Sequence, residues 1–128
     1  MTQKDKELLL RDLCARLPYG VRYRHFTWND EFGEIYIAAR IYSINTDGYV
    51  KNCYDDETVY IDNVRPYLFS LFSMTEEQEK EYNDLNCYEL GCFPHTEDAL
   101  DYLIKNHFDF RCLISKGLAI DATGLNVY

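Results

Sequence analysis

One segment of the sequence combines residue types that bind zinc. Cys87, Cys92 and His95 could occupy three corners of a tetrahedral zinc site, and His107 or Cys112 could supply the fourth. The chain has no second paired motif and no short Cys-x-x-Cys knuckle, and cysteine is also a common small core residue. We therefore expect no bound metal and no cofactor, and keep these residues as weak metal candidates.

Two cysteine–histidine pairs could in principle support thiol catalysis, namely Cys112 with His107 and Cys53 with His25. Five cysteines and three histidines produce such spacings easily. His107 falls on the apolar face of a predicted helix, where a core histidine bonded to the backbone is favoured. The sequence also has no Gly-rich phosphate loop, no His-Glu-x-x-His and no Gly-x-Ser-x-Gly. These observations argue against an enzyme.

Two acidic clusters, Asp30-Glu31 and Asp55-Asp56-Glu57, offer oxygen ligands but not the spacing of a calcium-binding loop. We expect both to be turns.

The segment Arg22-Tyr23-Arg24-His25-Phe26 interleaves bases with aromatic residues, as single-strand-binding surfaces on small barrels do. Arg16 could extend it into a basic stripe. An ordinary strand with arginines on its solvent face gives the same pattern. The candidate binding residues are Arg16, Tyr19, Arg22, Tyr23, Arg24 and Tyr67.

A helix from about Thr2 to Leu17 must precede this segment. Thr2 can cap it, with Asp5 completing a weaker capping box. The predicted buried stripe, widened by Leu9, consists of Leu10, Leu13, Cys14 and Leu17. Pro18 ends the helix.

From Gly20 to Val64 the hydrophobic period changes to two, which predicts strands. Four short strands joined by polar turns, among them Asp47-Gly48, indicate an antiparallel meander. A sheet of so few residues is expected to curl into a half-open barrel that the helices close.

The C-terminal half is predicted to be mainly helical. Leu68 to Met74 is expected to be an apolar connector, followed by a helix that Thr75 and Gln78 cap and that runs to about Leu85. After a loop over 86–95, Thr96 caps a third helix. A short helical turn from Asp109 stops at Lys116-Gly117, and Leu118-Ala119-Ile120 could add an edge strand.

Composition limits the class of protein. With 128 residues and no linker or repeat, the chain is expected to be one α+β domain over 1–128. The odd number of scattered cysteines and the lack of a signal peptide or a long apolar run predict reduced thiols and a cytoplasmic location. Residues 1–28 have six Lys or Arg against three acidic residues, whereas the whole chain has a net charge of −9. The net charge therefore disfavours a polyanionic binding partner, except near the basic N-terminal segment.

Several stretches resemble a family of short uncharacterised proteins found in gut Bacteroidales genomes and in their phages and mobile elements. The resemblance covers both ends of the chain, at 12–21, 64–68, 73–77, 106–111 and 116–119, but not 22–53. Glycine is usual in that family where this chain has Cys112, which argues against a general role for this thiol. The resemblance implies a mobile-element accessory protein and no particular chemistry.

Together these patterns predict a non-enzymatic interaction protein that binds a host or phage protein through an aromatic and acidic surface. The twelve tyrosines favour the prediction of a protein-binding role, because tyrosine suits interfaces as well as half-buried sheet faces. The alternatives are a small nucleic-acid-binding barrel and, less favoured, a zinc- or thiol-dependent enzyme.

Overall fold

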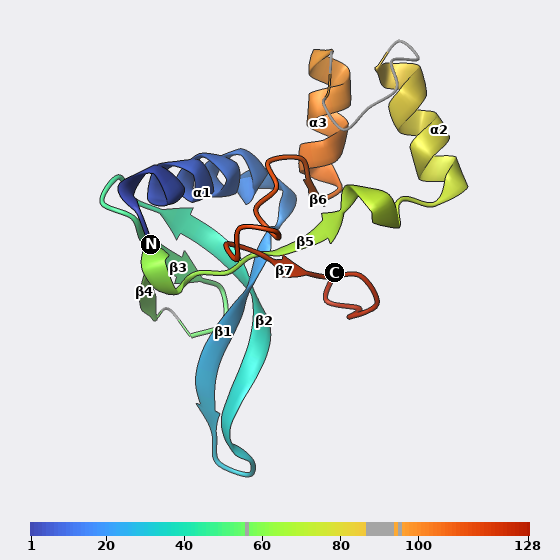
Figure 1. The fold of residues 1–128 in the computed structure, drawn as a ribbon. Helices are drawn as coiled ribbons and strands as arrows, with labels where there is room; N and C mark the ends of the chain where they lie inside the picture. The colour runs from blue at the N-terminus through green and yellow to red at the C-terminus, as the bar shows by residue number, and fades with distance from the viewer. Residues whose placement is uncertain (56, 87–93, 95) are drawn as a thin grey trace.

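The computed structural model of the chain describes residues 1–55, 57–86, 94 and 96–128. An N-terminal helix crosses one side of a curled antiparallel sheet, and a pair of C-terminal helices stands beside it (Figure 1). The α+β class, the N-terminal helix, the half-barrel sheet and the C-terminal helices are confirmed.

Helix α1 (Gln3–Arg16) begins where the side chain of Thr2 accepts a hydrogen bond from the backbone N–H of Asp5 at 3.1 Å. The short helix η1 (Leu17–Tyr19) follows it, and Gly20 ends η1 in the left-handed conformation. The buried stripe consists of Leu9, Asp12, Leu13 and Arg16.

The predicted stripe of α1 was therefore wrong at Cys14, whereas Leu9 and Leu13 are buried and Leu10 and Leu17 pack half-buried against the same core. Cys14 is exposed, and the buried face includes a charged pair, Asp12 and Arg16. Hydrophobicity alone could not locate this face, because the two charged residues are buried through contacts with a distant part of the chain.

The antiparallel sheet has the strand order β1-β2-β3-β4. Its members are β1 (Arg22–Asn29), β2 (Gly33–Ile44), β3 (Tyr49–Asn52) and β4 (Thr58–Tyr60). A register shift between Ile41 and Ser43 bends β2 where it meets β3. The short helix η2 (Ile61–Asn63) then leads back toward β1, where the backbone N–H of Arg24 donates to the carbonyl of Arg65 at 3.1 Å.

A second, three-stranded sheet was not expected. Its central strand β5 (Tyr67–Ser70) pairs in parallel with β6 (Phe108–Asp109) on one side and β7 (Ile120–Asp121) on the other. The predicted connector at 68–74 is thus a strand followed by the short helix η3 (Leu71–Ser73). Parallel pairs join residues far apart in sequence, so two-residue strands leave almost no local pattern.

Helices α2 (Glu76–Leu85) and α3 (Glu97–Lys105) begin at the predicted caps, Thr75 and Thr96. They enclose a small core of Tyr82, Ala99, Leu103 and Phe108, distinct from the larger core between α1 and the antiparallel sheet. No helix in the described ranges is both long enough and apolar enough to cross a membrane.

Candidate functional site

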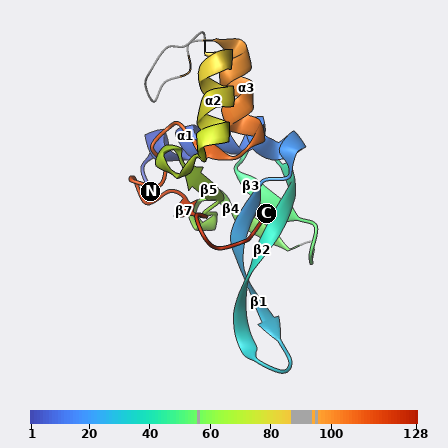
Figure 2. The same ribbon diagram turned by 90° about the vertical axis from the view of Figure 1, so that its right-hand side faces the viewer.

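The outer half of the β1–β2 hairpin projects from the body of the molecule (Figures 1 and 2). β3 pairs with β2 only at residues 41–44, so the outer parts of β1 and β2 pair with each other and with no further strand in the described chain. The turn is fixed locally, because the side-chain oxygen of Asn29 accepts hydrogen bonds from the backbone N–H groups of Glu31 and Phe32. Two-stranded ribbons of this kind are marginally stable alone.

One face of this hairpin exposes aromatic side chains. Phe26 is paired with Tyr36, their ring centroids 5.4 Å apart, and Trp28 lies opposite Glu34. The exposed fractions are 47% for Phe26, 66% for Trp28 and 61% for Tyr36, and Phe32 in the turn is 72% exposed. We call these four residues the aromatic ribbon. Because one exposed aromatic is ordinary but four at the outer end of a single hairpin are not, the ribbon is a candidate docking surface.

Arginines share the same face as the aromatic ribbon. The Arg24 guanidinium lies 4.8 Å from the centre of the Tyr36 ring, within cation–π range. Arg22 lies opposite Arg40 one step further along the hairpin, and its guanidinium donates to the carbonyl of Ala38 at 3.0 Å.

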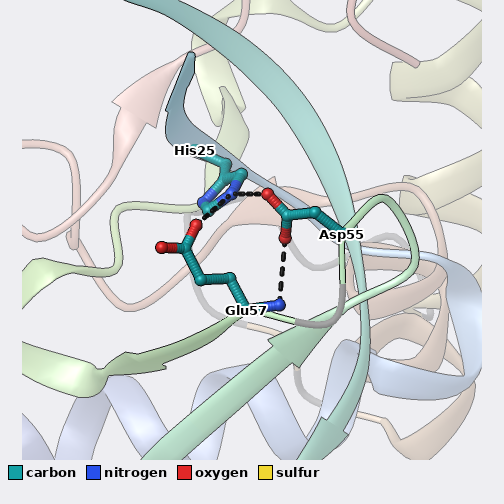
Figure 3. A group of neighbouring side chains, drawn as sticks. All are labelled: His25, Asp55 and Glu57. Carbon is teal, nitrogen blue, oxygen red and sulfur yellow. Dashed lines mark hydrogen bonds and ion pairs between the residues drawn. The ribbon is translucent and has the colours of Figure 1, made fainter.

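The opposite face of β1 presents His25, which is only 3% exposed, to the connection between β3 and β4 (Figure 3). Its Nε2 lies 2.8 Å from Oδ2 of Asp55 and 3.5 Å from Oε2 of Glu57, and its Nδ1 lies 3.0 Å from the hydroxyl of Tyr23. We call His25, Asp55 and Glu57 the His–carboxylate cluster. Its three potential ligand atoms all lie within 4.8 Å of one another.

Asn52 holds this cluster in place. Its amide nitrogen donates to the Tyr23 hydroxyl at 2.9 Å and to Oδ1 of Asp55 at 3.1 Å. Its amide oxygen accepts from the backbone N–H groups of Tyr54 and Asp55, which fixes the turn. Desolvation acts to raise the pKa of Asp55, but hydrogen bonds from His25, the Glu57 backbone and Asn52 outweigh it and leave this pKa below its usual value. Asp55 is thus ionised at neutral pH.

A cleft of ≈ 200 Å³ adjoins both features. Arg24, Phe26 and Tyr36 of the hairpin line one part of it, and Glu57 and Arg65 line another. Its walls therefore combine aromatic surface, two guanidinium groups and one side of the His–carboxylate cluster.

The six predicted binding residues do not form one surface. Arg16 was wrongly placed in a basic stripe, because it is fully buried and its guanidinium bonds Asp12 and the carbonyls of Leu103, Ile104 and Phe108. Tyr23 and Tyr67 are also buried, at 1% and 8% exposure. Tyr19 is exposed, Arg24 is exposed and Arg22 is half-buried.

The predicted metal and thiol residues are not brought together within the described chain. Cys87, Cys92 and His95 lie outside the described residues. His107 is buried, its Nε2 bonded to the carbonyl of Tyr19 at 3.0 Å, which confirms the expected core histidine bonded to the backbone, although it follows α3 rather than lying on it. Cys112 is exposed with φ of 59°, a left-handed conformation that favours glycine.

Sequence reasoning missed most of the ribbon and the cluster. Trp28 and Tyr36 were visible as members of alternating strands, but only the register that pairs Phe26 with Tyr36 places them on one exposed face. Asp55 and Glu57 were predicted to be turn residues, and Asp55 lies in a turn while Glu57 directly precedes β4. Only the curl of the sheet brings the two residues to His25.

Comparison with protein-family models gave no match, and comparisons with curated proteins and with solved structures gave no significant match either.

Proposed function

We propose that this chain is a non-enzymatic interaction protein that binds another protein through the aromatic ribbon. The observation that carries the proposal is the exposure of Phe26, Trp28, Phe32 and Tyr36 on a hairpin that extends beyond the body of the molecule. Aromatic anchors dominate the energetics of many protein interfaces, and large exposed apolar patches on soluble proteins often mark them.

The outer part of the β1 edge pairs with no further strand in the described chain, which supports the same proposal. The backbone of Arg24 points away from β2, since its N–H donates to Arg65. Alternate residues of an antiparallel strand share this direction, so the backbone groups of Phe26 and Trp28 also point outward. A partner segment in extended conformation could pair with this edge while its side chains contact the aromatic ribbon.

The resemblance to proteins of Bacteroidales phages and mobile elements makes a host or phage protein the expected partner. An accessory protein of this kind would modulate the machinery of one or the other.

The test is affinity capture of partners from the native host by the tagged protein and by two variants. Trp28→Ser combined with Tyr36→Ser removes two anchors, while Phe72→Ser removes an aromatic that is 90% exposed outside the ribbon. We expect a captured protein whose measured affinity falls about tenfold or more in the double variant and is unchanged in Phe72→Ser. Equal binding by all three proteins would refute the ribbon as the docking surface.

Nucleic acid is the second candidate, because Arg22, Arg24 and Arg40 share a face with stacking aromatics. Acidic residues at the outer end of the hairpin, Asp30 and Glu31 in the turn and Glu34 in β2, argue against this candidate, and the whole chain has a net charge of −9. Binding of fluorescent single-stranded oligonucleotides is therefore expected to be weak. Tight, salt-sensitive binding that is lost in Arg24→Glu combined with Arg40→Glu would replace the protein-binding proposal with this one.

A further inference from the structure

The His–carboxylate cluster has the donor atoms and spacing of a metal site. The distances from His25 Nε2 to the carboxylate oxygens of Asp55 and Glu57 are 2.8 and 3.5 Å. Ligands that each lie about 2.0–2.2 Å from one ion are separated from one another by about 3–3.5 Å in tetrahedral or octahedral geometry. Both distances from His25 are thus close to the separation of two ligands on one ion.

The surroundings of the cluster match those of metal-binding histidines. Such histidines donate their second ring N–H to a fixed acceptor, which orients the ring. Here the Tyr23 hydroxyl lies 3.0 Å from Nδ1 and is itself bonded by Asn52. Without an ion, Tyr23 can donate to Nδ1 while Nε2–H donates to Asp55. With an ion, Nδ1–H can donate to the Tyr23 oxygen, which frees the Nε2 lone pair.

The charges at the cluster favour a cation. Asp55 and Glu57 bring two carboxylates beside one imidazole, and in the described part of the chain no lysine or arginine forms an ion pair with either of them. Among the described residues, the basic side chain beside both carboxylates is thus the imidazole of His25, and a divalent ion would neutralise both carboxylates. Glu57 is exposed and lines the adjoining cleft, so an ion could reach the cluster from solvent.

We propose that His25, Asp55 and Glu57 form a binding site for a divalent transition-metal ion. One imidazole nitrogen with two carboxylate oxygens suits zinc or manganese better than calcium or magnesium, which prefer oxygen ligands alone. Three protein ligands leave at least one coordination position open. This site is separate from the weak candidates Cys87, Cys92 and His95, and it does not depend on the aromatic ribbon binding a protein.

The test is calorimetric titration of the full chain with ZnCl2, in a Cys92→Ser background that impairs the cysteine segment as a competing site. Glu57→Gln keeps the shape of an exposed side chain and removes its charge, and Glu79→Gln on α2 is the matched control. We expect one zinc per chain, with affinity lowered about tenfold or more by Glu57→Gln and unchanged by Glu79→Gln. Magnesium should bind far more weakly.

Imidazole nitrogen NMR of the same samples supplies a second readout. Zinc should shift the Nε2 resonance of His25 in the parent protein, and the assignment rests on its loss in His25→Gln. No saturable zinc binding, equal affinity in Glu57→Gln and the parent, or an unshifted His25 resonance at saturation would each overturn the proposal.

Discussion

At the scale of single residues, the buried Asp12–Arg16 pair links the two halves of the chain. Arg16 Nε lies 2.8 Å from Oδ2 of Asp12, and its remaining nitrogens donate to carbonyls at the end of α3 and in β6. Arg111 also bonds Asp12, at 3.1 Å. A guanidinium can satisfy several acceptors at once in a fixed geometry, which lysine cannot do. Arg16 therefore stabilises the junction between α1 and the C-terminal half.

Replacing Arg16 should be strongly destabilising. Arg16→Leu removes the donors for three carbonyls and leaves Asp12 with Arg111 alone, so we expect the free energy of unfolding to fall by about 3–5 kcal/mol. Urea denaturation would measure it. Arg11→Leu, on the exposed side of the same helix, is the control and should change stability by less than about 0.5 kcal/mol. Similar losses in both variants would contradict the structural role of Arg16.

His107 should make stability depend on pH. Burial, together with the nearby positive charge of Arg16, lowers the pKa of His107 from 6.5 to about 4, despite its bond to the Tyr19 carbonyl. Between these values the unfolded chain binds a proton that the folded chain does not, so stability falls as the pH drops from about 6.5 to about 4. We expect this loss to be smaller in His107→Asn, because asparagine does not titrate in this range. Asparagine is chosen because it tolerates the φ of 60° at this position.

The measurement is the urea midpoint of the parent and of His107→Asn at several pH values. Asp55 and Asp121 have lowered pKa values, so their contributions to stability are lost mainly as the pH falls below about 4. Both residues are present in the two proteins, so they cancel in the comparison. A difference between the two proteins that stays constant from neutral pH to about 4 would argue against titration of His107.

At the scale of elements, α1 packs on the antiparallel sheet through one side only. Leu13 is fully buried in the larger core, whereas Cys14 is exposed. Leu13→Ala should therefore lower the free energy of unfolding by about 2–4 kcal/mol through lost contacts and a cavity. Cys14→Ser should have little effect, and the pair of variants is compared by denaturant unfolding. If Cys14→Ser proved as costly as Leu13→Ala, the helix would have to be rotated from the position seen here.

The hairpin differs from α1 as an element, because its outer half does not contribute to either core. Its outer residues belong to neither core, and the four side chains of the aromatic ribbon are exposed. Such a segment contributes little to stability, which is why substitutions in the aromatic ribbon can test binding without unfolding the protein.

At the scale of the whole molecule, the cysteines provide a test of the expected reducing environment. Cys14, Cys53 and Cys112 are free thiols and exposed. We predict that thiol titration of the native protein, denatured without reductant, finds all five cysteines of the chain reduced. Three free thiols instead of five would indicate one disulfide, most simply between the neighbours Cys87 and Cys92.

The sequence by itself determined the features that depend on local interactions. Thr2, Thr75 and Thr96 cap the three helices as predicted, because a capping hydrogen bond joins residues three apart. The alternation between Gly20 and Val64 likewise predicted the antiparallel strands, since each side chain's face follows from its position in the strand.

Only the tertiary structure decided the features that join distant segments. Arg16 is buried because carbonyls of residues 103–108 lie against α1 and accept its hydrogen bonds. Asp55 and Glu57 lie beside His25 because the sheet curls. The tertiary structure also formed the parallel sheet around β5 from segments some forty to fifty residues apart. No local pattern encodes such contacts, because their energy depends on where the rest of the chain lies.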